Sequence, residues 1–484
     1  MKRALSAGLP LTLFAAMAWP AGASAQELSI DQVAGQLDVT WIIVAACLVM
    51  FMQAGFAFLE IGFSRGKNVA SGIAKILANF SIASIAWWAI GFALAFGGAN
   101  KIAGDSGFFF SHGQTIAGEA AFGDAAAFML FQFMFCAVSL AIVWGTTLER
   151  IKFSAYVIYA AVFAAVIYPL GAHWIFGGGF LSEIGSGVQD FAGSTVVHLV
   201  GATGAFAALL LLGPRKGKYG PDGKPRAIPG HSMPLVGLGV MILWLGWFGF
   251  NAGSTLGTAD SRFAEVALVT HLGAAGGVIA ASLLIYLKTK ALDVGMSGNG
   301  AIAGLVAITA PSGYVEFWAA PIIGAVGGVV VVLGVLAIEK WLDDPVGALS
   351  AHGLAGIWGT LACGLFTSDR LAEYNGIGNP GLFYSGSFEQ LGVQAVGVGA
   401  AFAAVFTLSI ITFAAIKATI GLRVSEAEEL AGLDIATHGM YGYPEQFIDA
   451  AEFGAASTGP AAPEYAAGGK AATVSAMSPL EVTR

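Results

Sequence analysis

Long apolar runs separated by short polar stretches occupy the chain from about residue 38 to residue 418. The hydrocarbon core of a bilayer is about 30 Å thick, so a helix needs roughly 20 apolar residues to cross it. The pattern therefore predicts an all-α integral membrane protein with eleven transmembrane helices, of which the eighth is short. The predicted spans are 38–62, 76–97, 125–147, 153–172, 193–213, 232–254, 263–287, 297–311, 317–338, 351–368 and 391–418.

The two ends of the chain differ from this pattern. Residues 1–25 are typical of a cleaved signal peptide, with two basic residues, the apolar stretch LPLTLFAAMAW and a final small-residue sequence ASA. An uncleaved first transmembrane helix is the alternative, but this apolar stretch is too short to span a bilayer. Residues 419–450 are expected to dock on the cytoplasmic face. Residues 451–484 are rich in Ala, Gly, Ser and Pro and are predicted to be disordered.

Basic residues are distributed unequally between the predicted loops. If the mature N-terminus lies outside, 17 Lys and Arg residues fall in inner loops or the C-terminal tail. The outer loops then carry only Lys101, Arg262 and Arg370. Cytoplasmic loops are enriched in positive charge, so the chain is predicted to be N-out and C-in, in the inner or plasma membrane.

Composition supports the membrane assignment and excludes several function classes. The chain is 57% hydrophobic and 11% charged, against about 25% charged residues in soluble domains. Its 68 glycines predict close helix packing. The sequence contains no basic patch that would indicate binding to nucleic acid. Cys47, Cys136 and Cys363 show no metal or redox spacing and are interpreted as inert packing residues. No cofactor is expected.

A polar pattern occurs twice within the apolar runs. DFAGSTVVH (190–198) and DPVGALSAH (344–352) each contain an Asp, a Gly three residues later and a His eight residues later. The first motif leads into the fifth span from outside and the second into the tenth from inside. Matched elements that enter in opposite directions are typical of inverted repeats. We therefore predict repeats at about 38–213 and about 232–368, with the span 391–418 added.

The repeated histidines, His198 and His352, are candidates for a polar path. A single histidine in a membrane helix is commonly a packing residue, but two in equivalent places favour a substrate or proton pathway near the bilayer midplane. An apolar environment favours neutral imidazoles, which can exchange protons. A membrane metalloenzyme is a weak alternative, because the chain has no H-E-x-x-H or similar ligand spacing. Neither an enzyme activity nor a metal site is expected.

The two aspartates of the motifs precede their apolar runs. Asp344 is expected to cap a helix start through backbone N–H groups. For Asp190, capping and attraction of a cation at the outer mouth are both open.

Aromatic side chains at helical spacing suggest a cation site. Phe131 and Phe135 share one face of the third span, and Trp247, Phe250 and Ser254 share one face of the sixth. Core packing is the usual explanation of such stripes. The functional alternative is a vestibule in which ring faces hold a cation and the Ser254 hydroxyl accepts a hydrogen bond.

Eight stretches, in order from about residue 38 to 443, together resemble the ammonium transporter/methylammonium permease family. Each is weak alone, but the ordered set is specific. They are MQAGFAFLEIGFSRGKN, LERIKFSAY, HWIFGGGFL, DFAGSTVVH, LGWFGFNAGS, NGAIAGLVAITA, AHGLAGIWGT and GLDIATHGM.

The resemblance implies a homotrimer with a hydrophobic pore in each subunit, which transports ammonium or ammonia, with methylammonium as a second substrate, and is surrounded by membrane lipid. By this resemblance Trp247 and Ser254 form the outer ammonium site. Phe131 and Phe135 lie at the vestibule of that site, with Asp190 nearby. Phe135 and Phe250 form a stacked gate below it, and His198 and His352 are the pore histidines.

One position departs from the family pattern. Phe176 stands where many members carry Trp. If this position belongs to the recruitment site, the site contains a ring that lacks an N–H group and has a weaker π-face. Glu60, in the first span, receives no role. The segment RVSEAEELAGLDIATHGM resembles the family's cytoplasmic regulatory segment, where a PII-type protein can plug the pore, so such a partner is a candidate. The alternatives are a Rhesus-type gas channel, disfavoured by Trp247 and Ser254, and an ammonium sensor, for which no signalling domain is recognised after residue 450.

Overall fold

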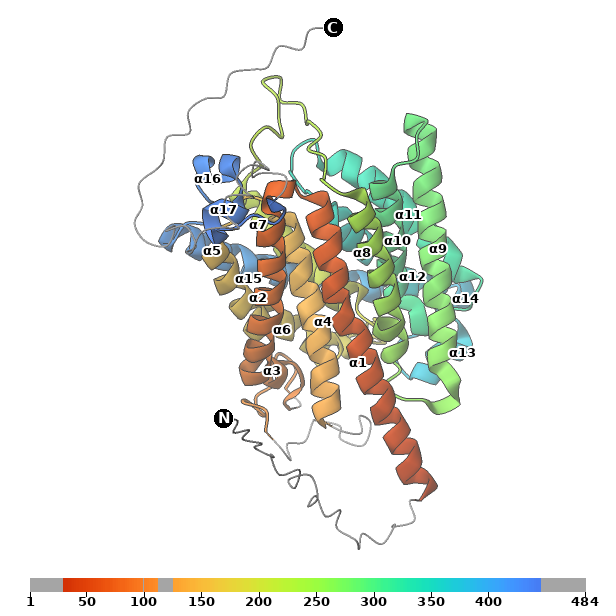
Figure 1. Ribbon diagram of the computed structural model, residues 1–484. Helices are drawn as coiled ribbons and strands as arrows, with labels where there is room; N and C mark the ends of the chain where they lie inside the picture. The colour runs from red at the N-terminus through yellow and green to blue at the C-terminus, as the bar shows by residue number, and fades with distance from the viewer. Residues whose placement is uncertain (1–28, 99, 112–124, 445–484) are drawn as a thin grey trace, which may run out of the picture.

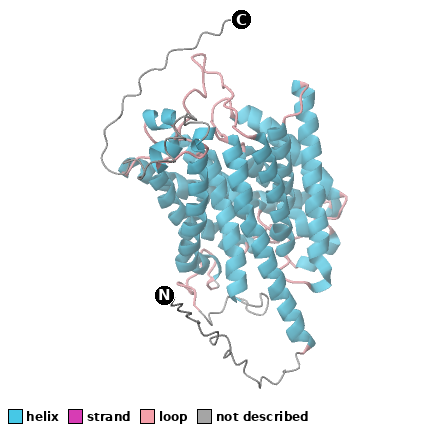
Figure 2. Ribbon diagram, in the orientation of Figure 1, coloured by secondary structure: helices cyan, strands magenta, loops and turns pink. Residues whose placement is uncertain are grey.

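The described part of the protein consists of helices and loops. The computed structural model describes residues 29–98, 100–111 and 125–444 (Figures 1 and 2). Within these described ranges, ten helical segments are long and apolar enough to cross a membrane, and an eleventh, α10, is apolar but only 16 residues long. The predicted all-α membrane fold is confirmed, whereas the number and direction of crossings stay predictions. The signal peptide at 1–25 and the tail at 451–484 lie outside the described residues.

Several of these apolar segments are broken into shorter helices, which are joined by π-helical turns. The main elements are α1 (Ile30–Phe63), α2 (Val69–Ala86), α3 (Phe92–Phe96), α4 (Ala125–Thr146), α5 (Phe153–Val162), α6 (Tyr168–Ile175), η6 (Ser194–Leu199), α7 (Val200–Leu212), α8 (Met233–Trp247), η7 (Phe248–Ala252), α9 (Arg262–Thr289), α10 (Val294–Thr309), α11 (Ala319–Ile338), η10 (Leu349–Leu354), α12 (Ala355–Phe366), α13 (Asp369–Asn375), α14 (Leu382–Ser385), α15 (Glu389–Thr419), α16 (Glu426–Ala431) and α17 (Leu433–His438).

The first helix starts eight residues before its apolar run. Ser29 caps α1 by accepting a hydrogen bond from the backbone N–H of Gln32, whose side chain in turn accepts one from the backbone N–H of Ser29. This capping box satisfies two N–H groups that a helix start leaves without partners. A good cap and a few polar residues thus extend the helix beyond the length that hydrophobicity predicts.

Glycine allows α9, α10 and α11 to pack closely, as the composition predicts. A Cβ added at Gly324 of α11 would lie 1.8 Å from the carbonyl oxygen of Gly273 in α9. A Cβ at Gly277 of α9 would lie 2.8 Å from the Cα of Gly304 in α10. Small residues let helix backbones approach in a membrane, where packing replaces the hydrophobic driving force.

The cysteines only partly match the expectation. Cys136 and Cys363 are buried, as inert packing residues would be, but Cys47 is exposed. Cys47 is exposed because of its place on α1, where Met50 and Phe51 are exposed as well. Cys47 lies on the outward face of an apolar helix rather than in the core.

The two ends of the bundle carry different loops. We call the end with the start of α1 the outer end, and the opposite end, with α16 and α17, the inner end (Figure 1). The described part of the C-terminal segment, residues 419–444, docks on the inner end, whereas residues 445–450 of the predicted segment lie outside the described residues. There Asp434 accepts a hydrogen bond from the backbone N–H of Ser71 at 2.8 Å, and Asn68 accepts one from the backbone N–H of Leu433 at 2.9 Å.

A buried cluster of charges links four inner loops, which follow α1, α4, α7 and α11. Arg215 donates two side-chain hydrogen bonds to Asp343, each 2.9 Å long, and Arg215 Nη1 lies 3.6 Å from Glu149. Arg65 donates to Glu149 at 2.8 Å, and Arg150 donates to the backbone carbonyl of Asp343 at 2.7 Å. Burial alone would raise the pKa of Asp343, but the positive charges of Arg150 and Arg215 outweigh it and bring that pKa to about 2.

We expect Asp343→Ala to lower the stability of the protein by about 3–5 kcal/mol, because it leaves the Arg215 guanidinium buried without its main partner. The Asp343 pKa is depressed below its ordinary value of 3.8, so its contribution is present above that pH and is lost as the pH falls through about 2. Thermal unfolding in detergent at pH 7 measures the effect. Asp222→Ala, at an exposed loop residue, is the matched control; equal melting temperatures for the two variants would contradict the prediction.

Candidate functional site

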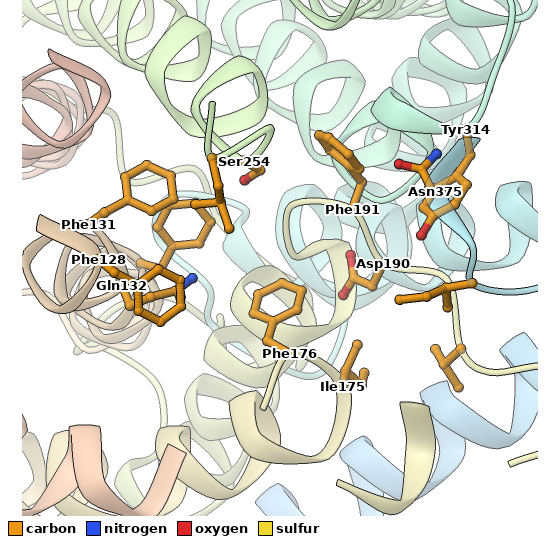
Figure 3. Close-up of a pocket in the computed structure, with 14 residues that line it drawn as sticks. Phe128, Phe131, Gln132, Ile175, Phe176, Asp190, Phe191, Ser254, Tyr314 and Asn375 are labelled. Atoms are coloured by element: carbon orange, nitrogen blue, oxygen red, sulfur yellow. The ribbon is translucent and has the colours of Figure 1, made fainter. Parts of the chain in front are cut away.

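A cavity of about 340 Å³ opens at the outer end of the bundle (Figure 3). In the view of Figure 3, Phe128 and Phe131 of α4 lie on one side of it and Asp190, Phe191 and Tyr314 on the other, with Ser254 and Phe176 between them. Its walls are mostly apolar, with a few polar groups. The lining residues are Phe128, Phe131, Gln132, Phe135, Ile175, Phe176, Val188, Asp190, Phe191, Ser254, Leu256, Tyr314, Asn375 and Ile377.

Two stacked phenylalanines close the cavity on the side of the membrane interior. The ring centroids of Phe135 and Phe250 are 4.0 Å apart and the planes differ by 18°. Phe131 packs against Phe135 at 4.8 Å. Both stacked rings are almost completely buried, so they separate the outer cavity from the interior of the bundle.

The two repeated histidines lie directly below this stack. The Phe250 ring is 5.5 Å from the His198 ring, and His198 stacks on His352 at 5.3 Å. The two Nδ1 atoms are 3.2 Å apart, within hydrogen-bonding distance. Residues 154 positions apart are thereby brought into one buried pair, as the repeated motif predicts.

The contact between the two Nδ1 atoms constrains the tautomers. A neutral imidazole has one N–H donor and one bare acceptor nitrogen. One Nδ1 must therefore donate and the other accept, so the outward nitrogens differ: one Nε2 is an acceptor and the other is a donor. The pair can consequently accept from a molecule at one end and donate to it at the other.

Trp247 does not lie where the sequence analysis placed it. Its side chain is completely buried, stacks on His198 at 5.3 Å and donates a hydrogen bond from Nε1 to Thr309 at 2.9 Å. It is not among the residues that line the outer cavity. The expected position of Trp247 beside Ser254 is therefore wrong. The difference arises because the wide π-helical turn η7 follows Trp247. This turn changes the direction in which the side chains before and after it point.

Ser254 does line the outer cavity. Its hydroxyl donates to the backbone carbonyl of Phe250 at 2.9 Å, which leaves the oxygen free to accept. Phe176 also lines the cavity, so the position that departs from the family pattern faces the same space as Ser254.

Gln132 is a polar lining residue that the sequence analysis missed. It follows Phe131 within FQFMF, is 6% exposed, and its side-chain oxygen has no hydrogen-bond partner among the described residues. An amide in a run of apolar residues was the available signal, because a polar group in a membrane helix usually has a function.

Asp190 lines the cavity but is already fully engaged. Its carboxylate accepts four backbone N–H bonds, from residues 193 to 196, at 2.8, 2.8, 3.0 and 3.0 Å. These are the N–H groups that the start of η6 leaves without helical partners. Asp344 caps η10 in the same way, accepting from Gly347 at 3.0 Å and Leu349 at 2.8 Å. The predicted capping by Asp344 is confirmed.

The shared glycine of the two motifs has a backbone reason. Gly193 has φ +115° and Gly347 has φ +75°, a region that residues with a Cβ rarely adopt. Each glycine turns the chain from its aspartate into the π-helical turn that carries the histidine. Phe250 stands on a π-helical turn as well, and such turns often occur at functional sites.

A second cavity, of about 370 Å³, lies at the inner end. Charged groups from several loops line it, among them Arg215, Lys218, Asp293 and Asp344. A bundle with a cavity at each end and a buried column of polar rings between them defines a membrane transport protein.

Comparison with known proteins specifies the family. Residues 40–443 match the Ammonium Transporter Family. Ammonium transporter Amt2 of Archaeoglobus fulgidus is 45% identical over 421 residues, covering 84% of this chain and 88% of the relative. The structure of a sensor Amt protein superposes with a TM-score of 0.77 at 36% identity, covering 84% of this chain and 100% of the other. Mep2 of Candida albicans superposes with a TM-score of 0.74 at 29% identity, covering 81% of this chain and 87% of the other.

The chain therefore belongs to the ammonium transporter family, and the family predicted from the eight stretches is confirmed. Its relatives are named as transporters rather than enzymes.

Proposed function

We propose that the protein takes up NH₄⁺ in the outer cavity, removes a proton from it, and conducts NH₃ along His198 and His352 to the inner cavity. The observation that carries this proposal is the buried histidine pair, with its Nδ1 atoms 3.2 Å apart, directly below the stacked Phe135 and Phe250.

Capture of the cation uses the groups that line the outer cavity. Phe131 and Phe176 offer ring faces, and Ser254 and Gln132 offer oxygen acceptors. A cation over a desolvated ring gains about 2 kcal/mol, and NH₄⁺ has four N–H donors to share between acceptors and water. We assign recruitment to these residues and a packing role beside His198 to Trp247.

Passage beyond the cavity favours the neutral form. The stacked rings of Phe135 and Phe250 offer no acceptor for an ion that has lost its water. Burying an unpaired charge costs far more free energy than burying a neutral polar molecule. The cation is therefore expected to give up a proton in the outer cavity and to pass the rings as NH₃.

The histidine pair suits NH₃ because ammonia is both an acceptor and a donor. The Nε2 atom that carries hydrogen can donate to the ammonia lone pair, and the bare Nε2 can accept from an ammonia N–H. The Nε2 of His198 has no hydrogen-bond partner among the described residues, so this site is available for a passing molecule.

Reconstitution into proteoliposomes tests the proposal directly. Ammonium applied outside is expected to produce inward flux that saturates with concentration, whereas K⁺ at equal concentration produces none. Equal responses to the two ions would contradict the proposal. A sensor function is the second candidate, favoured by the likeness to the sensor Amt protein. Saturable ammonium binding without flux would support that function instead.

The further properties expected from the family resemblance belong to the same proposal. They are placement in the plasma membrane, two inverted repeats, assembly as a homotrimer and a PII-type partner at the inner end. The two Asp caps and the paired histidines support the repeat, and the mass of the reconstituted complex tests the trimer.

We expect Phe176→Trp to lower the half-saturating ammonium concentration by about two- to fivefold, because the indole face binds a cation more strongly by about 0.5–1 kcal/mol. Concentration-dependent uptake of ammonium and methylammonium measures this. Phe388→Trp, at an exposed residue away from the cavity, is the control and is expected to have no effect. Identical kinetics for both variants would remove Phe176 from the recruitment site.

A further inference from the structure

We propose that Glu60 is a proton acceptor of the conduction path, placed on the inner side of His352. The inference rests on the proposed function and extends it, because it states where the proton removed from ammonium goes. Glu60 lies within the apolar helix α1, is 2% exposed, and its Oε2 atom has no hydrogen-bond partner among the described residues. Burying a carboxyl group without a full set of hydrogen bonds costs free energy of folding. Such a group in a membrane helix therefore indicates a function.

Glu60 and His352 line one small cavity. Its volume is about 20 Å³, and a cavity of about 10–15 Å³ can hold one water molecule. Phe56 precedes Glu60 by one helical turn, so both project from the same face of α1. The Phe56 ring is 6.3 Å from the His352 ring, which places this face of α1 beside the histidine pair.

The small cavity adjoins the inner cavity. Asn299 and Val346 line both of them. Asn299 donates a hydrogen bond to the backbone carbonyl of Val346 at 3.1 Å, which fixes the shared wall. Glu60 thus stands between the histidine pair on one side and a wide, charged cavity on the other.

The proton transfer balances with water as the carrier. An N–H bond of NH₄⁺ breaks in the outer cavity, and a water molecule passing between the Phe135 and Phe250 rings carries this proton to the bare Nε2 of His198, where an N–H bond forms. The Nδ1 proton of His198 then moves to Nδ1 of His352. At His352 an N–H bond breaks and the water in the small cavity receives that proton. The same water passes one of its own protons to a carboxylate oxygen of Glu60, where an O–H bond forms. Glu60 then releases its proton to water in the inner cavity and returns to the carboxylate form.

This step makes transport electrogenic, because NH₃ and H⁺ cross separately but in the same direction. The neutral path and the proton path share the histidines and diverge at the small cavity. Removing the carboxylate is therefore expected to stop the charge movement.

Glu60→Gln is the decisive substitution, because it keeps the volume of the side chain and removes its ability to accept a proton. Ammonium-evoked current in proteoliposomes is expected to fall at least about tenfold, which corresponds to about 1.4 kcal/mol in the barrier. Glu60→Asp, which keeps the carboxylate, is expected to retain most of the current. The control is Gln53→Leu, at another buried polar residue of α1 that does not line the small cavity.

A second variant tests the path without touching the carboxyl group. Val346→Ile adds one methylene group to the wall of a cavity that has room for a single water, and is expected to reduce the current while the protein still binds ammonium. It keeps the proposal testable if Glu60→Gln does not fold.

The outcomes separate the inference from the function on which it rests. The role of Glu60 is overturned if Glu60→Gln carries a current within twofold of the wild-type current. If Glu60→Gln does not fold, the same criterion applies to Val346→Ile. Wild-type ammonium flux without any current also overturns this role and leaves the proposed function intact. If the wild type shows neither flux nor current, the proposed function itself fails.

Discussion

The double variant His198→Ala with His352→Ala is expected to lose about 10- to 100-fold of the ammonium flux. In the proposed path each imidazole makes one hydrogen bond to passing ammonia, and a hydrogen bond contributes about 0.5–1.5 kcal/mol net. Losing two of them raises the barrier by about 1–3 kcal/mol, and each 1.4 kcal/mol is about tenfold in rate. Flux and current in proteoliposomes under one ammonium gradient measure this.

The structure provides a matched histidine control. His271 lies on α9, is exposed, and contacts Trp244 and Phe248 rather than the buried column. His271→Ala is expected to transport as the wild type does. Undiminished and selective flux in the double variant would contradict the histidine path, whatever the single variants show.

Asp190→Ala is expected to destabilise the protein by at least about 3 kcal/mol. The substitution leaves four backbone N–H groups at the start of η6 without an acceptor, and each hydrogen bond to a charged group contributes about 1.5–3 kcal/mol. Because η6 carries His198, the variant is also expected to lose transport. Melting temperature in detergent and flux in proteoliposomes give the two readouts.

Asp190→Asn separates capping from cation attraction. The amide keeps one acceptor oxygen, so stability is expected to be intermediate, and flux is expected to follow stability. Asp105→Ala removes an exposed carboxylate at the same end of the bundle and is the control for long-range attraction. If Asp190→Ala melted like the wild type and only raised the half-saturating concentration, the carboxylate would act on the cation instead of the helix.

Much of the fold follows from hydrophobic length alone. Each predicted span overlaps a helical segment of the described residues that is apolar, and α10 is short in the structure as in the prediction. Helix limits were less accurate, because caps and polar extensions decide them. Ser29 moves the start of α1 outside its apolar run.

The sequence predicts the positions of some site residues and not of others, and the backbone geometry explains the difference. His198 and His352 could be paired from sequence because the repeated Asp–Gly–His spacing encodes a repeated backbone geometry, down to the two glycines with positive φ. Trp247 was misplaced because spacings of three and four residues define one face only in a regular α-helix. The π-helical turn after Trp247 breaks that rule, and no residue type marks such a turn.

Three of the five π-helical turns in the described residues also restrict how the chain can change its length. Residues 194–199, 248–252 and 349–354 each form one such turn, and they carry His198, Phe250 and His352. Side chains advance by about 100° per residue along a helix. Deleting one residue from any of these turns would therefore rotate all later side chains of that helix by about a quarter turn, exchanging lipid-facing for pore-facing positions. Homologous chains are thus expected to vary in loop length while insertions and deletions stay excluded from these three short stretches.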